Sequence, residues 1–132
     1  MKKRILCLIM SFVTLTILTL SVFAIQPRWS YTASVTFAMY FDGEEGSLEG
    51  CVEGYSDVTK IDGTITLYYK NFLGIWTKTD NVWSMTTYSD TLYLNHTFTA
   101  ESGKQYKAVL DVDVYSGSNS ENITDDATGT CP

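Results

Sequence analysis

Hydrophobic and polar residues alternate along most of this chain, which is the pattern of β-strands with one buried face. Clusters of Gly, Asp, Asn and Ser, such as DGEEGS at 42–47, separate the alternating segments and are typical of turns. After the N-terminal apolar run, no segment shows the spacing of an amphipathic helix. The alternation predicts strands over residues 29–41, 48–53, 61–71, 92–98 and 106–114.

The segment 75–88 predicts two strands joined by a tight hairpin at Asp80-Asn81, a pair that tolerates positive φ. In such a hairpin Trp76 faces Met85 and Lys78 faces Trp83, so both tryptophans share one face. That face could fill the core, or it could lie outside as a platform for sugar rings. The core interpretation is favoured, because a small domain needs this apolar area and the opposite face is rich in Thr.

Seven to eight strands with no helix between them predict an all-β fold, an immunoglobulin-like antiparallel β-sandwich. The last strand is expected to be short, near residues 122–127 of a polar tail. Tyr106 begins a strongly alternating strand just after the turn at Gly103. We therefore expect a tyrosine corner, in which the Tyr106 hydroxyl bonds to nearby backbone.

The N-terminus has the pattern of a secretory signal peptide, which predicts a signal helix at residues 1–24 and a single domain at residues 25–132. The basic head MKKR precedes an uncharged run from Ile5 to Ala24, and Val22-Phe23-Ala24 suits cleavage after Ala24. Because the run is long enough to span a bilayer, a membrane anchor formed by residues 5–24 is the alternative. The expected location is extracellular.

The predicted mature domain is strongly acidic. The whole chain has nine Lys and Arg against fifteen Asp and Glu, and Lys2, Lys3 and Arg4 leave with the signal, so the net charge becomes −9. Such a surface repels nucleic acid and anionic lipid headgroups. The charge therefore excludes nucleic acid as a partner and limits expected membrane contact to an uncleaved signal sequence.

Cys51 and Cys131 are the two cysteines of the predicted mature domain. Outside the cell such a pair suggests one disulfide, which would close a loop of about 80 residues and contribute at most roughly 4–5 kcal/mol. Two free thiols are the alternative if no oxidising pathway acts on the chain.

Catalytic chemistry has little support in the sequence. His96 is the single histidine, no nucleophile elbow accompanies it, and its parity with Leu94 and Phe98 predicts a partly buried strand residue. The acidic clusters at 42–49, Asp111/Asp113 and Asp125/Asp126 match no known calcium loop or glycosidase spacing. We predict neither an enzyme nor a metal site or cofactor.

Several marks along residues 28–121 resemble a family of small secreted single-domain proteins, mostly uncharacterised, from Gram-positive, clostridia-like bacteria. These marks are Arg28-Trp29, Tyr31, Gly50-Cys51, the segment VTKI at 58–61, Leu67, Trp76 after a Gly, Trp83-Ser84 and Gly103-x-x-Tyr106. The resemblance implies secretion of one domain and assigns no active residues.

The predicted function is therefore non-catalytic binding outside the cell, with a protein or an envelope polymer as partner. A carbohydrate-binding module with exposed aromatic residues is the first alternative, for which the candidate binding residues are Trp76, Trp83, Tyr68 and Tyr93. A small secreted hydrolase is the second alternative, and it relies on the abundant carboxylates alone.

Overall fold

The computed structural model describes residues 29–132, and the predicted signal helix of residues 1–24 lies outside this range. No helix of the described part is long and apolar enough to cross a membrane. The described chain forms seven strands: β1 (Thr32–Asp42), β2 (Glu45–Gly54), β3 (Lys60–Lys70), β4 (Trp76–Thr87), β5 (Thr91–Thr99), β6 (Gln105–Ser116) and β7 (Asn119–Thr130).

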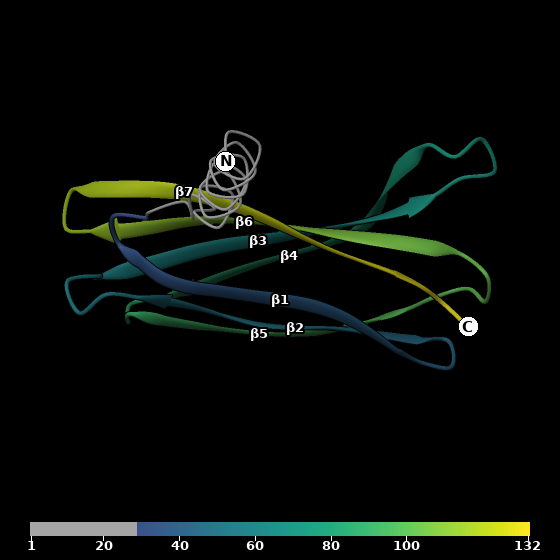
Figure 1. Ribbon diagram of the computed structural model, residues 1–132, viewed down its shortest axis with the longest axis horizontal. Helices are drawn as coiled ribbons and strands as arrows, with labels where there is room; N and C mark the ends of the chain where they lie inside the picture. The colour runs from purple at the N-terminus through teal and green to yellow at the C-terminus, as the bar shows by residue number, and fades with distance from the viewer. Residues whose placement is uncertain (1–28) are drawn as a thin grey trace, which may run out of the picture.

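The strands form two sheets that pack face to face, one in the order β1-β2-β5 and the other in the order β4-β3-β6-β7. Figure 1 shows these sheets as two layers, with every paired neighbour antiparallel. An immunoglobulin-like β-sandwich divides its strands between two antiparallel layers in this way. The predicted fold class and the predicted number of strands are confirmed.

The core lies between the layers and is built from the inward-facing half of each alternating strand. Ile61, Ile65 and Leu67 of β3 are almost fully buried, as are Leu110 and Val112 of the neighbouring β6. An aromatic cluster fills one end of this core, where the ring of Phe98 lies 6.0 Å from that of Phe41 and 5.4 Å from that of Tyr106. Alternation in the sequence thus corresponds to burial in the structure.

Tyr106 forms the predicted tyrosine corner. Its ring is buried, and its hydroxyl accepts a hydrogen bond of 2.9 Å from the backbone N–H of Glu101. This bond fixes the turn before β6, because it ties the loop to a side chain held in the core. The turn at Gly103, which has a φ of 81°, completes the corner.

One carboxylate joins the two sheets along the side where β1 and β7 meet. Glu121 of β7 accepts hydrogen bonds from the backbone N–H groups of Ser30, Tyr31 and Thr32 and from the Thr32 hydroxyl, at 2.7 to 2.9 Å. Partial burial raises the pKa of Glu121, but these four donors lower it more, so the pKa lies below its ordinary value. The start of β1 is therefore held by a charged group that is fully hydrogen-bonded.

The predicted hairpin at Asp80-Asn81 is wrong, because β4 runs unbroken through both residues. Residues 79–81 form a bulge opposite Leu67, where the Thr79 hydroxyl donates a 2.9 Å hydrogen bond to the Leu67 carbonyl. A two-residue turn there would need positive φ, which no described non-glycine residue adopts. The connection from β3 to β4 is instead the turn at 71–75, with Gly74 at a φ of 76°.

The last strand is longer than predicted. β7 spans Asn119–Thr130 and pairs with β6 along its whole length. Its outward positions are Ser, Asn, Asp and Thr, and its inward positions include Glu121 and Asp125, so its hydrophobic alternation is weak. The backbone pairing of an edge strand does not require a strongly apolar face.

Candidate binding surface

The turn between β3 and β4 is the most unusual part of the surface. Phe72 is 95% exposed, Leu73 67% and Ile75 57%, although all three are large apolar residues within five positions. In Figure 1 this teal turn, at the upper right, extends well away from the sheet that contains β1, β2 and β5. Clustered exposed apolar side chains of this kind mark interaction sites more often than chance.

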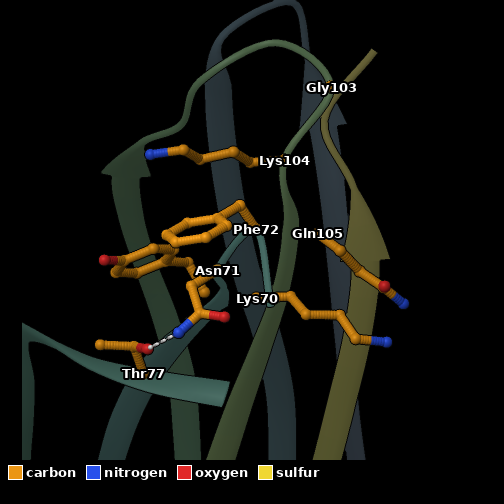
Figure 2. Close-up of a pocket in the computed structure, with 8 residues that line it drawn as sticks. Lys70, Asn71, Phe72, Thr77, Gly103, Lys104 and Gln105 are labelled. Carbon is orange, nitrogen blue, oxygen red and sulfur yellow. Dashed lines mark hydrogen bonds between the residues drawn. The ribbon is translucent and has the colours of Figure 1, made fainter. Parts of the chain in front are cut away.

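Asn71 holds this turn in a defined shape. Its side-chain oxygen accepts hydrogen bonds of 3.0 Å from the N–H groups of Leu73 and Ile75. Its amide donates to the Thr77 hydroxyl at 3.3 Å, the bond marked in Figure 2. Its backbone N–H donates to the Ile75 carbonyl, and its own carbonyl accepts from Gly74. The exposed apolar side chains are therefore presented by a turn with an internal hydrogen-bond network.

Lysines and aromatic rings lie directly behind the turn, on the outer face of the four-stranded sheet. The Lys107 ammonium lies 4.8 Å from the centre of the Trp76 ring and 5.7 Å from that of Tyr68. Lys70 lies 5.5 Å from the same Trp76 ring, and Lys78 pairs across the strands with Tyr68. The contacts of Lys70 and Lys107 with these rings are cation–π contacts.

A hollow of about 770 Å³ lies on the other side of the turn, between it and the β5–β6 connection. Figure 2 shows Phe72 beside Lys104 in this hollow, with Lys70 extending in the opposite direction. Lys104 lies 4.8 Å from the centre of the Tyr69 ring and forms a salt bridge of 2.8 Å with Glu101. The hydrogen bond that the Lys104 ammonium donates to the Glu101 carboxylate raises the pKa of Lys104.

We call this region the hairpin-end surface and define it by Tyr68, Lys70, Phe72, Leu73, Ile75, Trp76, Lys78, Lys104 and Lys107. It contains four of the five lysines found in residues 29–132. Within that part of the chain, Lys70, Lys78 and Lys107 form no salt bridge. Positive charge is therefore concentrated here, opposite in sign to the charge of the whole domain, and among these four lysines Lys104 is paired with Glu101.

The four predicted binding residues do not form one surface. Trp76 and Tyr68 share the hairpin-end surface, where Lys107 lies against both rings. Trp83 lies on the inner face of the same strand and stacks on His96 at 5.3 Å. Tyr93 is 78% exposed on β5, in the other sheet. The prediction that both tryptophans share a face is wrong, because an uninterrupted strand places residues seven positions apart on opposite faces.

His96 has a packing role. Its ring lies between the two sheets, stacked on Trp83, with its Nε2 atom 3.0 Å from the Met85 sulfur. Partial desolvation lowers the pKa of His96. The prediction of a partly buried strand histidine is confirmed.

The predicted disulfide between Cys51 and Cys131 is not formed, and both cysteines are free thiols. Cys51 points outward from β2, where it pairs with Thr36 and Tyr93, whereas Cys131 is buried with its sulfur 3.3 Å from the Gly43 carbonyl. Gly43 precedes β2, and Cys51 lies about 20 Å along that strand from its start. A disulfide needs Cα atoms within roughly 7 Å of each other, so this geometry cannot support the bridge.

Two of the carboxylates considered for catalysis, Asp111 and Asp113, accept hydrogen bonds from a neighbouring amide. The Asn122 amide donates to Asp111 at 2.6 Å and to Asp113 at 2.9 Å, on the outer face of the sheet. Asp62, in the next strand, accepts from the Thr86 hydroxyl and from Lys60, which together lower its pKa. Among residues 29–132, no group of three or more His, Cys, Asp and Glu side chains is placed to hold a metal ion.

The exposed turn was missed in the sequence, although a signal was present. Residues 71–75 read Asn-Phe-Leu-Gly-Ile, with a turn-forming Asn and a Gly on either side of two large apolar residues. The predicted strands end at residue 71 and begin again at residue 75, so they assign no role to Phe72, Leu73 or Gly74. Hydrophobic residues at a Gly-containing turn predict exposure, because the tip of a hairpin lies outside the core.

Comparison with known proteins identifies no family for this chain. The sequence matches no protein-family model and no curated protein. Solved structures that resemble it include the collagen-binding subdomain ACE19 of the Enterococcus faecalis surface protein ACE, with 11% identity, a TM-score of 0.45, and coverage of 78% of this chain and 98% of that one. A CARDB domain from Pyrococcus furiosus has 13% identity, a TM-score of 0.41, and coverage of 80% and 100%.

A third similar structure is CsgH from R. palustris, with 16% identity, a TM-score of 0.39, and coverage of 72% of this chain and 90% of that one. Likeness at this level concerns overall fold and adds nothing about ligand or activity. The strand order and pairing of the chain itself define an immunoglobulin-like β-sandwich domain.

Proposed function

We propose that this chain is a secreted, non-catalytic binding module that holds a negatively charged partner on the hairpin-end surface. The observation that carries the proposal is the set of three lysines without salt bridges among the described residues, Lys70, Lys78 and Lys107, beside the partly exposed rings of Trp76 and Tyr68. Ammonium groups oriented by aromatic rings can bind an anion without first breaking internal ion pairs.

Secretion is part of this proposal and is supported by the N-terminal pattern of a basic head and an apolar run ending in Val-x-Ala. The resemblance to small secreted domains of clostridia-like bacteria is consistent with it and stays a prediction. The expected partner is then an extracellular protein or an envelope polymer that carries negative charge.

Carbohydrate binding is the second candidate function, because Trp76 and Tyr68 lie on the same outward face. Lys107 covers part of both rings, so this surface is not a bare platform for neutral sugars. Acidic sugars suit it better, since a carboxylate or sulfate could bind Lys107 and Lys70 while the sugar ring lies against Trp76. Trp83 and Tyr93 have no part in this version.

The experiment measures retention of the protein on immobilised polygalacturonate and on neutral dextran at increasing salt. We expect retention on the acidic polymer alone, and a weakening with salt because the contact is electrostatic. Trp76→Ala and Lys107→Gln should each weaken binding about fivefold, which corresponds to loss of one contact of roughly 1 kcal/mol.

Lys60→Gln is the matched control. Lys60 is also a surface lysine near aromatic rings, but it lies at the opposite end of β3 and is paired with Asp62 at 2.8 Å. Its replacement should leave retention unchanged. Equal losses for Lys60→Gln and Lys107→Gln, or equal retention on dextran, would contradict the proposal. Turnover of the polymer that is lost with Asp111→Asn would favour the hydrolase alternative.

A further inference from the structure

We propose that the negatively charged partner is the surface of an anionic lipid bilayer, into which the β3–β4 turn inserts Phe72, Leu73 and Ile75. This inference rests on the proposed function, because it uses the same surface, and it replaces the protein or envelope polymer expected there by a layer of anionic lipid headgroups. A soluble acidic polymer would need the lysines and Trp76 but would leave the three exposed apolar side chains without a role.

The internal hydrogen bonds of the turn are the first argument for lipid. Backbone groups that enter a bilayer must be paired within the protein, because lipid tails offer no partners. The N–H groups of Leu73, Gly74 and Ile75 donate to Asn71, and the Ile75 carbonyl accepts from the Asn71 N–H. Four backbone groups of the inserted residues 72–75 are therefore already paired within the protein.

The order of chemistry along the hairpin is the second argument. Apolar side chains form the tip, and Trp76 and Lys70 follow immediately on the two strands. Trp is favoured at the boundary between lipid tails and water, and lysines favour the anionic headgroups just above it. Because Lys70 and Lys107 lie on one side of the hairpin and Lys104 lies in the hollow on the other, cations flank the tip on both sides.

Acidic residues are distributed unevenly around the hairpin end. On the outer face of β3 the nearest acidic residue is Asp62, eight residues from Lys70, which is about 26 Å along a strand and beyond the screening length of about 10 Å at 0.1 M salt. Two carboxylates lie nearer to Lys107, because Asp111 is four residues away on β6 and Asp126 of β7 pairs with Val109. At the same end of the sandwich Asp42, Glu44 and Glu45 belong to the β1–β2 turn at the lower right of Figure 1, and this turn contacts the β5–β6 connection, because the Ala100 N–H donates a 2.7 Å hydrogen bond to the Glu44 carbonyl.

The test is sedimentation of the full chain with vesicles of phosphatidylcholine, with and without an equal part of phosphatidylglycerol. Three variants are compared with the wild type: Phe72→Ser/Leu73→Ser/Ile75→Ser at the tip, Lys70→Gln/Lys107→Gln behind it, and Tyr88→Ser/Tyr93→Ser as the control. The control removes two rings that are 82% and 78% exposed elsewhere on the surface. All proteins keep the same residues 1–28, so binding by the apolar N-terminal run is equal in each of them.

We expect the tip variant to lose binding to anionic vesicles at least about tenfold, because inserted apolar area is removed. The lysine variant should bind about 25-fold more weakly, at roughly fivefold for each of its two lysines near an anionic surface. The control should bind as the wild type does. The tryptophan emission should shift to shorter wavelength with anionic vesicles, and Trp76→Phe should remove this shift. Unchanged thermal melting of all variants shows that their folds are intact.

The outcomes separate this inference from the proposed function. Retention on polygalacturonate with no difference between wild type and tip variant on vesicles would overturn the lipid inference and leave the proposed function standing. No retention on polygalacturonate, together with no difference between wild type and tip variant on vesicles, would overturn both the lipid inference and the proposed function. A wild-type dimer in sedimentation velocity that becomes a monomer in the tip variant would also overturn the lipid inference, because it would make the tip a contact between copies of the chain.

Discussion

The two halves of strand β4 differ in what their tryptophans contact. In the second half, Trp83 lies over the core, stacks on His96 of the opposite sheet and is flanked by Met85. In the first half, Trp76 lies on the outer face of the hairpin and contacts the ammonium groups of Lys70 and Lys107. The same residue type is used once to hold two sheets together and once as part of an exposed surface.

The bulge at 79–81 separates these halves. It adds two residues to β4 relative to β3, because Lys78 pairs with Tyr68 whereas Val82 pairs with Thr66. An even number of extra residues keeps the alternation of faces, so Trp76 stays outside and Trp83 stays inside. Extra twist at a bulge is expected, and it can turn the hairpin end away from the sandwich. The comparison teaches that one strand can contribute to the core and to a binding surface in succession.

The largest effect in this comparison is expected for Trp83→Ala. Loss of a partly buried tryptophan that bridges the sheets should cost about 3 kcal/mol of the free energy of unfolding. Urea denaturation followed by circular dichroism measures this loss as a lower midpoint with an unchanged slope. A cost similar to that of Trp76→Ala would contradict the assignment of the two tryptophans to different faces.

The inner half of β4 should also give the fold a dependence on pH through His96. Desolvation lowers the folded-state pKa of His96 below its ordinary value of 6.5, so the unfolded chain binds a proton more readily. The stabilisation is complete above about pH 6.5 and is lost as the pH falls toward the folded-state pKa. The difference in melting temperature between wild type and His96→Gln should therefore become smaller as the pH is lowered from 8 to 5. A difference that stays constant over this range would contradict the predicted role of His96.

Most of the fold could be predicted because alternation is a local signal. The inward positions of β3 and β6, such as Ile65, Leu67 and Leu110, are apolar at every second residue and are buried in the structure. Tyr106 could be assigned to a corner because its position after Gly103 has a single structural use in such sandwiches. The alternating strands and the tyrosine corner depend on residues that are close together in the sequence, so both can be predicted from the sequence alone.

The binding surface could not be predicted as completely, because it depends on where the chain turns. Asp80-Asn81 and Asn71–Gly74 are both plausible turns, and the choice between them reverses the relation of Trp76 to Trp83. The gathering of Lys70, Lys104 and Lys107 also depends on pairing between strands far apart in sequence. The prediction of a disulfide was wrong for a related reason. Cys51 lies at an outward position of its strand, whereas Cys131 is buried, and the sequence does not show how far apart the two lie.

The smallest effect on stability is expected for Trp76→Ala, and this substitution is the most direct test of the difference between Trp76 and Trp83. Its cation–π contacts with Lys70 and Lys107 are at the surface, where such contacts contribute about 0.5–1 kcal/mol, so the free energy of unfolding should fall by no more than that. The same substitution should weaken binding to an anionic partner, whereas Trp83→Ala, measured under conditions where it is folded, should not. Two tryptophans in one strand would then be separable by experiment, one in denaturation and the other in binding. If Trp76→Ala instead destabilised the fold as strongly as Trp83→Ala, the outer ring would be a structural support, and the hairpin-end surface would lose its central aromatic contact.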